Sequence, residues 1–411
     1  MEAPLVKLKY LADFNPTVPE SIRKSQEKFP IYPMDKIESF GKLSSDVESR
    51  PISELLNGYS YLEPTDVAYA KVTPCFENGK GILGRDLPGP SFATTELTVL
   101  RPKPGVDQRY LAYLLQTPEF MNPAISSMTG AGGLKRVSEE YIKNLKFPLP
   151  SLKEQKRIAD ELDRELAEID EFIADLQHLL ELEDERFKST ITSLVHPEPI
   201  KDIFNSSLNS VEWNGTTWRR THLGMVTHIN EGLVNPQEEP YSSMTLIAPN
   251  HVESGTGKIL YTETAIEQGA DSGKYLVKKG QVIFSKIRPA LLKSTIAMED
   301  CLCSADMYGI SANSDYLNNN FLIWFLLSRP FKTFALQNSS RAAMPKINRE
   351  GFSEIPIWVP SINFQNKFSE QFSEVSTKSH ISIEQLKHLN SLLLERKKEI
   401  LSTKLGHNGH Q

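Results

Sequence analysis

The chain has 411 residues, of which 39% are hydrophobic and 24% charged, with a net charge of −6. This length suggests two or three domains of ordinary globular composition. No stretch approaches the ~20 consecutive apolar residues of a membrane span, and the first residues lack the pattern of a secretory signal. Three cysteines are too few for a disulfide framework, so we expect a protein of the reducing cytoplasm.

The negative charge is concentrated in one segment. Residues 151–188 contain 13 Asp and Glu against 6 Lys and Arg, a balance of −7, which leaves −6 − (−7) = +1 for the rest of the chain. A near-neutral remainder neither supports nor excludes a surface for nucleic acid.

Residues 1–150 have the pattern of a mixed α+β domain. The compact apolar run 66–70 predicts a strand, and residues 110–116 predict a short helix with a buried aromatic face. Segments rich in Pro and Gly, such as 87–90, separate these elements. We expect a globule with a twisted, mostly antiparallel sheet.

Residues 151–200 predict one long helix, with Ser151 as its N-cap. Its apolar residues alternate at spacings of four and three, which is the pattern of a coiled-coil seam. The predicted seam consists of Leu162, Leu166, Ile169, Ile173, Leu176 and Leu180.

The second half of the chain repeats the first. Residues 136–155 are echoed by 346–365, each with a Pro-Ser pair followed by a glutamine, and residues 67–74 are echoed by 282–289. A duplication therefore predicts a second α+β domain over 201–360 and a second long helix over 361–405. The expected seam of that helix is Leu386, Leu389, Leu393 and Ile400, and residues 406–411 are expected to be a disordered tail.

Each predicted helix is too long to be covered by one domain. About 44 residues span ~66 Å at the rise of an α-helix, which exceeds the width of a ~150-residue domain. We expect the two helices to pack as an antiparallel coiled coil with a pseudo-two-fold axis; separate packing on the two domain cores is the alternative. Two such domains held by a fixed spacer suit two half-sites on duplex DNA.

The junction Ile142–Gln155, with Pro148 and Pro150, and the run Gln281–Arg288 resemble conserved segments of type I restriction–modification specificity subunits. The resemblance covers the whole chain in the family's order of recognition domain, helix, recognition domain, helix. It implies a non-catalytic protein without a cofactor or metal of its own. It also implies reading of a split asymmetric site in double-stranded DNA and binding of two methyltransferase subunits and, through them, of restriction subunits. S-adenosylmethionine, ATP and Mg are expected on these partners.

Two pairs of polar, basic segments are the candidates for DNA contacts, because they combine cations with donors and acceptors suited to base edges and phosphates. Solvated surface loops are the alternative for each of them. The candidates in the first domain are Lys71, Thr73, Thr129, Gly130, Lys135 and Arg136, and those in the second are Ser285, Lys286, Arg288, Asn338, Ser340, Arg341 and Lys346.

Motifs for chemistry are incomplete. The Gly-Thr-Gly-Lys run at 255–258 lacks the spacing of a phosphate-binding loop, and we assign no catalytic residue. Three rival functions stay open: an enzyme with unrecognised motifs, a coiled-coil assembly protein that does not touch DNA, and the specificity subunit of another methyltransferase-based defence system.

Overall fold

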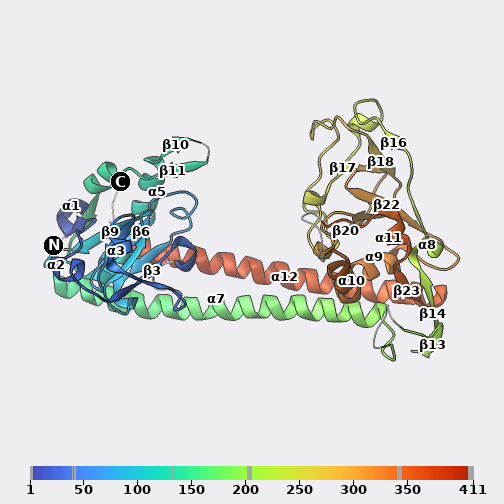
Figure 1. The fold of residues 1–411 in the computed structure, drawn as a ribbon, viewed down its shortest axis with the longest axis horizontal. Helices are drawn as coiled ribbons and strands as arrows, with labels where there is room; N and C mark the ends of the chain where they lie inside the picture. Colours follow the sequence, from blue (N-terminus) through green and yellow to red (C-terminus); the bar gives the residue numbers. More distant parts are fainter. Residues whose placement is uncertain are drawn as a thin grey trace. The chain divides into compact units, whose positions relative to one another are not determined.

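The computed structural model describes residues 3–38, 40, 43–131, 133–200, 206–339 and 345–405. The chain divides into two compact units, residues 1–176 with 387–411, and residues 177–386. Each unit combines one α+β domain with a stretch of each of two 44-residue helices, α7 (Leu152–Val195) and α12 (Ile362–Leu405) (Figure 1). The predicted fold class is confirmed. Among the described residues no helix is long and apolar enough to cross a membrane. The predicted tail 406–411 lies outside the described residues.

Two four-stranded sheets form the domain of the first unit. One is antiparallel in the order β2-β9-β6-β7, and the other, β4-β3-β8-β5, contains the parallel pair β3–β8. Its elements are β1 (Leu5–Lys7), α1 (Leu8–Leu11), β2 (Ala12–Phe14), α2 (Glu20–Arg23), β3 (Lys28–Tyr32), η1 (Met34–Lys36), β4 (Ser49–Pro51), α3 (Ile52–Leu55), β5 (Tyr59–Leu62), β6 (Val67–Ala70), β7 (Gly81–Leu83), η2 (Gly84–Asp86), β8 (Ser91–Thr94), β9 (Leu97–Pro102), α4 (Gln108–Leu114), α5 (Pro118–Ser126), β10 (Thr129–Ala131), β11 (Leu134–Arg136), α6 (Glu139–Asn144) and β12 (Lys146–Pro148).

The second unit repeats this plan. An antiparallel sheet in the order β15-β22-β19-β20 accompanies a sheet β16-β18-β21-β17 with the parallel pair β17–β21. Its elements are β13 (Ser210–Trp213), β14 (Thr216–His222), α8 (Leu223–Val226), β15 (Thr227–Ile229), β16 (Leu233–Val234), η3 (Tyr241–Ser243), β17 (Leu246–Ile247), η4 (Pro249–His251), β18 (Lys274–Val277), β19 (Val282–Ser285), η5 (Pro289–Leu291), β20 (Ser294–Ile296), β21 (Cys301–Cys303), β22 (Met307–Ala312), α9 (Asn319–Leu327), α10 (Arg329–Ser339), α11 (Arg349–Ser353) and β23 (Pro356–Val359).

The register of the strands makes the two copies comparable residue by residue. Val67 of β6 pairs with Leu83 of β7, and Val282 of β19 pairs with Ile296 of β20. The copies differ in the fourth strand of the second sheet: β4 pairs with β3 in the first copy, whereas β16 pairs with β18, at the opposite edge of the sheet, in the second. The central sheet is therefore the conserved part of the duplicated plan.

Each domain core continues onto the long helices. In the first unit, Phe120 and Leu111 of the domain belong to one apolar cluster with Leu162 of α7 and Ile400 and Leu401 of α12. In the second unit an equivalent cluster joins domain residues to α7 at 187–195 and, through partly buried Phe364, to α12. Burial of each large side chain contributes ~1.5–3 kcal/mol, so domain and helices form one packed body within each unit.

The two long helices pack antiparallel. In the first unit Lys404 of α12 binds Glu161 of α7 (3.0 Å), and Lys397, earlier on α12, binds Asp170, later on α7 (2.6 Å). The predicted seam residues with buried side chains are Leu162, Leu166, Ile173, Leu176 and Ile400, and those with half-buried side chains are Ile169, Leu180, Leu386 and Leu393.

One predicted seam residue is wrong: Leu389 is 45% exposed. The inward-facing row of α12 instead runs through Leu386, Asn390, Leu393 and Lys397. The apolar pattern alone allows either row, because Leu386, Leu389 and Leu393 also follow the spacing of a coiled-coil seam. Lys397 forms an ion pair with Asp170 of α7, and this contact places the row that contains Asn390 on the inward face of α12.

A buried glutamine joins each domain to the start of its long helix. Gln155 accepts a hydrogen bond from the Asp107 N–H (2.8 Å) and donates to the carbonyls of Gly105 (3.0 Å) and Pro150 (2.8 Å). Asp107 is also the N-cap of α4. The side chain of Gln155 therefore ties α7 to α4 and to the strand-end segment before α7.

The second copy repeats all three bonds. Gln365 accepts from the Asn318 N–H (2.9 Å) and donates to the carbonyls of Tyr316 (2.8 Å) and Pro360 (2.9 Å), and Asn318 is the N-cap of α9. Both glutamines are 0% exposed. Each one satisfies backbone groups that would otherwise be buried without partners.

We predict that Gln365→Leu lowers the free energy of unfolding of its unit by about 3 kcal/mol, because three buried backbone groups lose their partner. Gln155→Leu should have a matching effect on the first unit. Urea unfolding followed by fluorescence measures both, and Gln177→Leu, at an exposed position of α7, is the control. A loss no larger than that of the control would contradict the assigned role.

Candidate nucleic-acid interface

The first group of predicted DNA-binding residues lies where the chain leaves β6. Residues 71–73 pair with the strand end at 135–137, through the Val137 N–H to the Lys71 carbonyl (2.8 Å) and the Thr73 N–H to the Lys135 carbonyl (3.0 Å). The segment 135–137 includes the end of β11, which forms a two-stranded hairpin with β10. The structure thus joins two predicted segments, separated by about sixty residues in sequence, into one ladder.

Thr73 is the residue that holds this hairpin in place. Its side chain is 9% exposed, its hydroxyl donates to the Gly133 carbonyl (2.8 Å), and the same oxygen accepts from the Lys135 N–H (2.9 Å). Both bonds are made within the chain. Thr73 therefore positions the neighbouring residues of the hairpin.

The hairpin carries exposed cations on a closely packed backbone. The side chains of Thr129, Lys135 and Arg136 are exposed. Gly130 has φ 147°, and a Cβ at this position would lie 2.3 Å from the Leu134 carbonyl oxygen. A glycine is required there because β10 and β11 approach too closely for any side chain.

Lys71 lines a polar hollow of about 330 Å³ beside the hairpin. Asn15, Arg23, Tyr59 and Tyr61 line the same hollow. Partial burial lowers the pKa of the Lys71 ammonium, and the charge of nearby Arg136 lowers it further. An anion beside Lys71 would stabilise the charged form of its ammonium group, because the negative charge offsets both effects.

The second copy builds the same ladder with different residues. The Ile347 N–H donates to the Lys286 carbonyl (2.9 Å), and the Arg288 N–H donates to the Pro345 carbonyl (2.8 Å). Arg288 has a left-handed backbone (φ 45°, ψ 52°) and an exposed side chain, and Lys346 is exposed as well. Lys71 corresponds to Lys286 in this comparison.

Lys286 lies on an aromatic platform that sequence reasoning missed. Its ammonium is 5.1 Å from the centre of the Tyr308 ring, and the guanidinium of Arg349 is 5.5 Å from the same ring. Arg349 also donates to the carbonyls of Ile229 (3.2 Å) and Asn230 (2.6 Å). The sequence signal was weak, since Tyr308 reaches Lys286 through the pairing of β22 with β19 and Arg349 comes from α11.

The remaining predicted residues are placed as follows. Ser285 is 1% exposed and donates to the Ile287 carbonyl (3.0 Å), so its hydroxyl shapes the turn. Asn338 lies near the end of α10, and Ser340 and Arg341 lie outside the described residues. Across the described parts of the chain, no three His, Cys, Asp or Glu residues gather in a way that could hold a metal ion.

Comparison with known proteins matches the chain to one family. The family model for the type I restriction modification DNA specificity domain matches residues 84–182 and 218–393. The chain is 31% identical over 275 residues to the type I restriction enzyme EcoDI specificity subunit of Escherichia coli, covering 59% of this chain and 60% of that protein. It is 29% identical over 215 residues to the EcoAI specificity subunit of the same species, covering 51% and 34%.

A solved structure has the same fold over nearly the whole chain. A chain from a study of complex assembly and conformational transition of the type I R-M system superposes with a TM-score of 0.72, at 16% identity, covering 98% of this chain and 97% of that one. The chain belongs to the family of type I restriction–modification DNA specificity domains. It spans less than two thirds of the length of each of these two curated relatives.

We predict that Thr73→Val loosens the β10–β11 hairpin without disturbing the domain core, because valine keeps the shape but loses both hydrogen bonds. Amide hydrogen exchange at Lys135 should accelerate about tenfold, corresponding to one hydrogen bond of ~1–1.5 kcal/mol. Ser126→Ala, which removes an exposed hydroxyl bonded to the Asn122 carbonyl, is the matched control. Unchanged protection of Lys135 would show that Thr73 does not anchor the hairpin.

Proposed function

We propose that the chain is the DNA specificity subunit of a type I restriction–modification complex. Each α+β domain reads one half of a bipartite, asymmetric DNA site, and the long helices set the spacing and dock the methyltransferase. The subunit performs no chemistry. S-adenosylmethionine, ATP and Mg bind to the partner subunits. The complex works in the cytoplasm, where the DNA is.

The observation that carries this proposal is the duplicated ladder at the end of β6 and β19. The backbone pairing is the same in both copies, yet the side chains differ: Thr73 and Arg136 in the first correspond to Arg288 and Lys346 in the second. A constant frame with changed donors is what two unlike half-sites require, because base identity is read by side-chain donors and acceptors.

The predicted DNA-binding residues divide into two groups by their surroundings. The side chains proposed to face DNA are those of Lys71, Thr129, Lys135, Arg136, Lys286, Arg288, Asn338, Ser340, Arg341 and Lys346, with the backbone at Gly130 in close approach. Thr73 and Ser285 act by shaping the turns that carry them. Phosphate contacts by such cations release counterions, so binding should weaken steeply with salt.

Exposed leucines at duplicated positions support the docking of two methyltransferase subunits. Leu179 and Leu182 lie 24 and 27 residues after Gln155, and Leu389 and Leu392 lie 24 and 27 residues after Gln365. Their side chains are 46%, 50%, 45% and 45% exposed. One apolar pair in each unit provides two equivalent attachment points, and apolar side chains suit a stable subunit contact.

Arg136→Ala and Arg288→Ala should each impair recognition of a different half-site. A side chain that pairs with a base contributes ~1–3 kcal/mol of discrimination, so methylation of the correct half-site over its single-base variants should fall about 10- to 100-fold. The measurement is methylation of a library of site variants by the complex assembled with its methyltransferase.

Arg396→Ala, an exposed residue of α12 paired with Glu399, is the control for general loss of positive charge. Equal loss at both half-sites from either domain substitution would contradict the assignment of one half-site to each domain. Sequence-independent methylation by the wild-type complex would contradict the proposed function itself.

Leu182→Asp and Leu392→Asp should each remove one methyltransferase subunit, because a carboxylate cannot be buried in an apolar contact without a large cost. Native mass spectrometry should show two methyltransferase copies with the wild-type chain, one with either variant and none with the double variant. Leu260→Asp, at a leucine 51% exposed in the second domain, is the matched control. Two retained copies in the double variant would exclude these leucines as the docking surface.

A further inference from the structure

Asp163 of α7 collects hydrogen bonds from three side chains of the first recognition domain. Arg85 donates through both terminal nitrogens (3.1 and 3.3 Å), Arg109 donates at 2.6 Å, and the Tyr113 hydroxyl donates at 2.5 Å. Arg109 also contacts Asp160, one turn earlier on α7, at 2.7 Å. We call this group, Arg85, Arg109, Tyr113 and Asp163, the Asp163 clamp.

The clamp is a partly buried ionic contact. The Asp163 side chain is 26% exposed and that of Arg109 is 21% exposed. Burial acts to raise the pKa of Asp163, but the hydrogen bonds from Arg85, Tyr113 and Arg109 outweigh it, so the pKa lies below its ordinary value. Charge-assisted and bidentate bonds of this kind restrict geometry more than apolar packing does.

The clamp joins elements that have different directions. Arg85 lies in η2, immediately after β7, whereas Arg109 and Tyr113 lie on α4. Because a sheet edge and a helix of the domain both converge on one carboxylate, the domain is held on α7 at a defined angle. A single contact would leave rotation about that contact free.

Equivalent positions in the second copy hold no charge. The pairing of β20 with β19 places Met298 where Arg85 stands, because Ile296 corresponds to Leu83. Counted from the N-caps of α4 and α9, Arg109 corresponds to Asn320 and Tyr113 to Trp324. Ser373 lies eight residues after Gln365, as Asp163 lies eight residues after Gln155.

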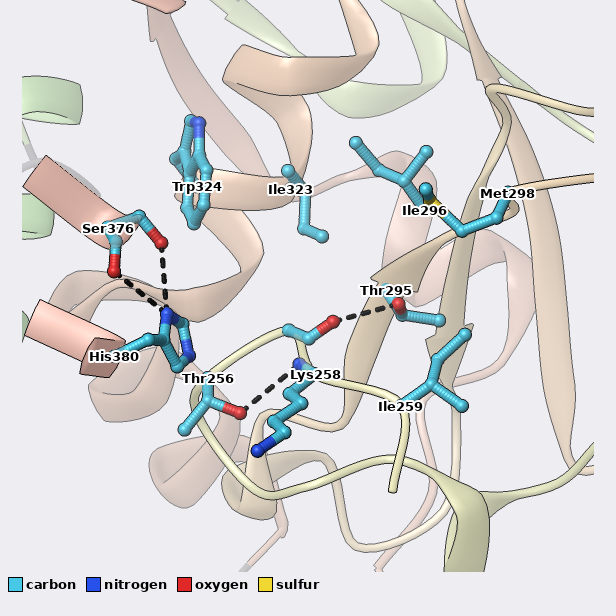
Figure 2. A pocket seen from close by; sticks show the side chains of 11 residues that line it. Thr256, Lys258, Ile259, Thr295, Ile296, Met298, Ile323, Trp324, Ser376 and His380 are labelled. Carbon is cyan, nitrogen blue, oxygen red and sulfur yellow. Dashed lines mark hydrogen bonds between the residues drawn. The ribbon is translucent and has the colours of Figure 1, made fainter. Parts of the chain in front are cut away.

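The second copy has a largely apolar hollow at this place. Figure 2 shows it between the second domain and α12, with Ile296, Met298 and Trp324 on the domain side and His380 on the helix. Its volume is about 420 Å³, and Met298 is 74% exposed. The second domain meets the long helices through two separate ion pairs instead, Lys258 with Glu384 of α12 (3.2 Å) and Arg329 with Glu185 of α7. The side chains of these two pairs are between 43% and 57% exposed, so each pair contributes less than the half-buried clamp.

We propose that Asp163 is a positioning residue that fixes the orientation of the first recognition domain on α7 and thereby the spacer length at which the first half-site can be read. This inference rests on the proposed function. The second domain has two exposed ion pairs in place of the half-buried clamp, so spacer selectivity depends more on the first domain than on the second. Replacement of Asp163 should relax the spacer requirement while leaving base preference within each half-site intact.

The test uses the complete complex with its methyltransferase and a plasmid library in which both wild-type half-sites are separated by spacers of every length near the native one. With Asp163→Asn, methylation at spacers one base pair longer or shorter should rise about tenfold relative to the native spacer, as expected when charge-assisted hydrogen bonds are lost. Asp163→Ala should relax the spacer requirement at least as much.

Glu168→Ala, at an exposed acid of the same helix, is the matched control and should keep the wild-type spacer profile. Thermal unfolding of each variant reports on folding, and base preference within each half-site reports on the reading loops. A wild-type spacer profile in both Asp163 variants would overturn the inference while the proposed function stands. Absence of site-specific methylation by the wild-type complex would instead be a failure of the proposed function.

Discussion

The buried amide of one glutamine determines how each recognition domain meets its long helix. Gln155 and Gln365 each bind one N–H and two carbonyls that belong to the N-terminus of a short domain helix and to the residues just before the long helix. These backbone groups are buried, and a different side chain would leave them without partners. The start of each long helix is therefore fixed to its domain in the same way in both copies, which is the condition for every further equivalence between them.

On this shared frame the two copies have diverged in the segments proposed to contact DNA and in the way each domain is anchored to the long helices. The ladder after β6 and β19 keeps its backbone pairing while its side chains change from Thr73 to Arg288. The anchorage of the domain changes as well, from the half-buried clamp at Asp163 to the exposed ion pairs of Lys258 with Glu384 and Arg329 with Glu185. Fusion of both copies in one chain permits this divergence, because neither copy needs to match a symmetric partner.

The sequence was sufficient where a periodic or repeated pattern carries the information. The long helices and most of their inward-facing leucines followed from the heptads, and the correspondence of the segments after β6 and β19 followed from the internal echo. The outward position of Leu389 did not follow from the sequence, because the leucines allow two inward-facing rows. The ion pair of Lys397 with Asp170 shows which row faces α7. Burial of the Thr73 hydroxyl and the platform of Lys286, Tyr308 and Arg349 arise from strands distant in sequence, and no local pattern encodes them.

The acidic composition of α7 has a structural explanation in the first unit. Glu161 and Glu165 bind Lys404, Asp170 binds Lys397, and Asp163 binds the domain. These carboxylates pair with cations that would otherwise lie at the contacts of α7 without a counter-charge. The acidic residues of α7 therefore help to hold α12 and the domain against it. An acidic surface on α7 also disfavours phosphate near the long helices, which agrees with the proposal that the basic segments after β6 and β19 contact DNA. The imbalance in sequence charge is thus consistent with DNA binding, because the acids and the exposed cations occupy different parts of the molecule.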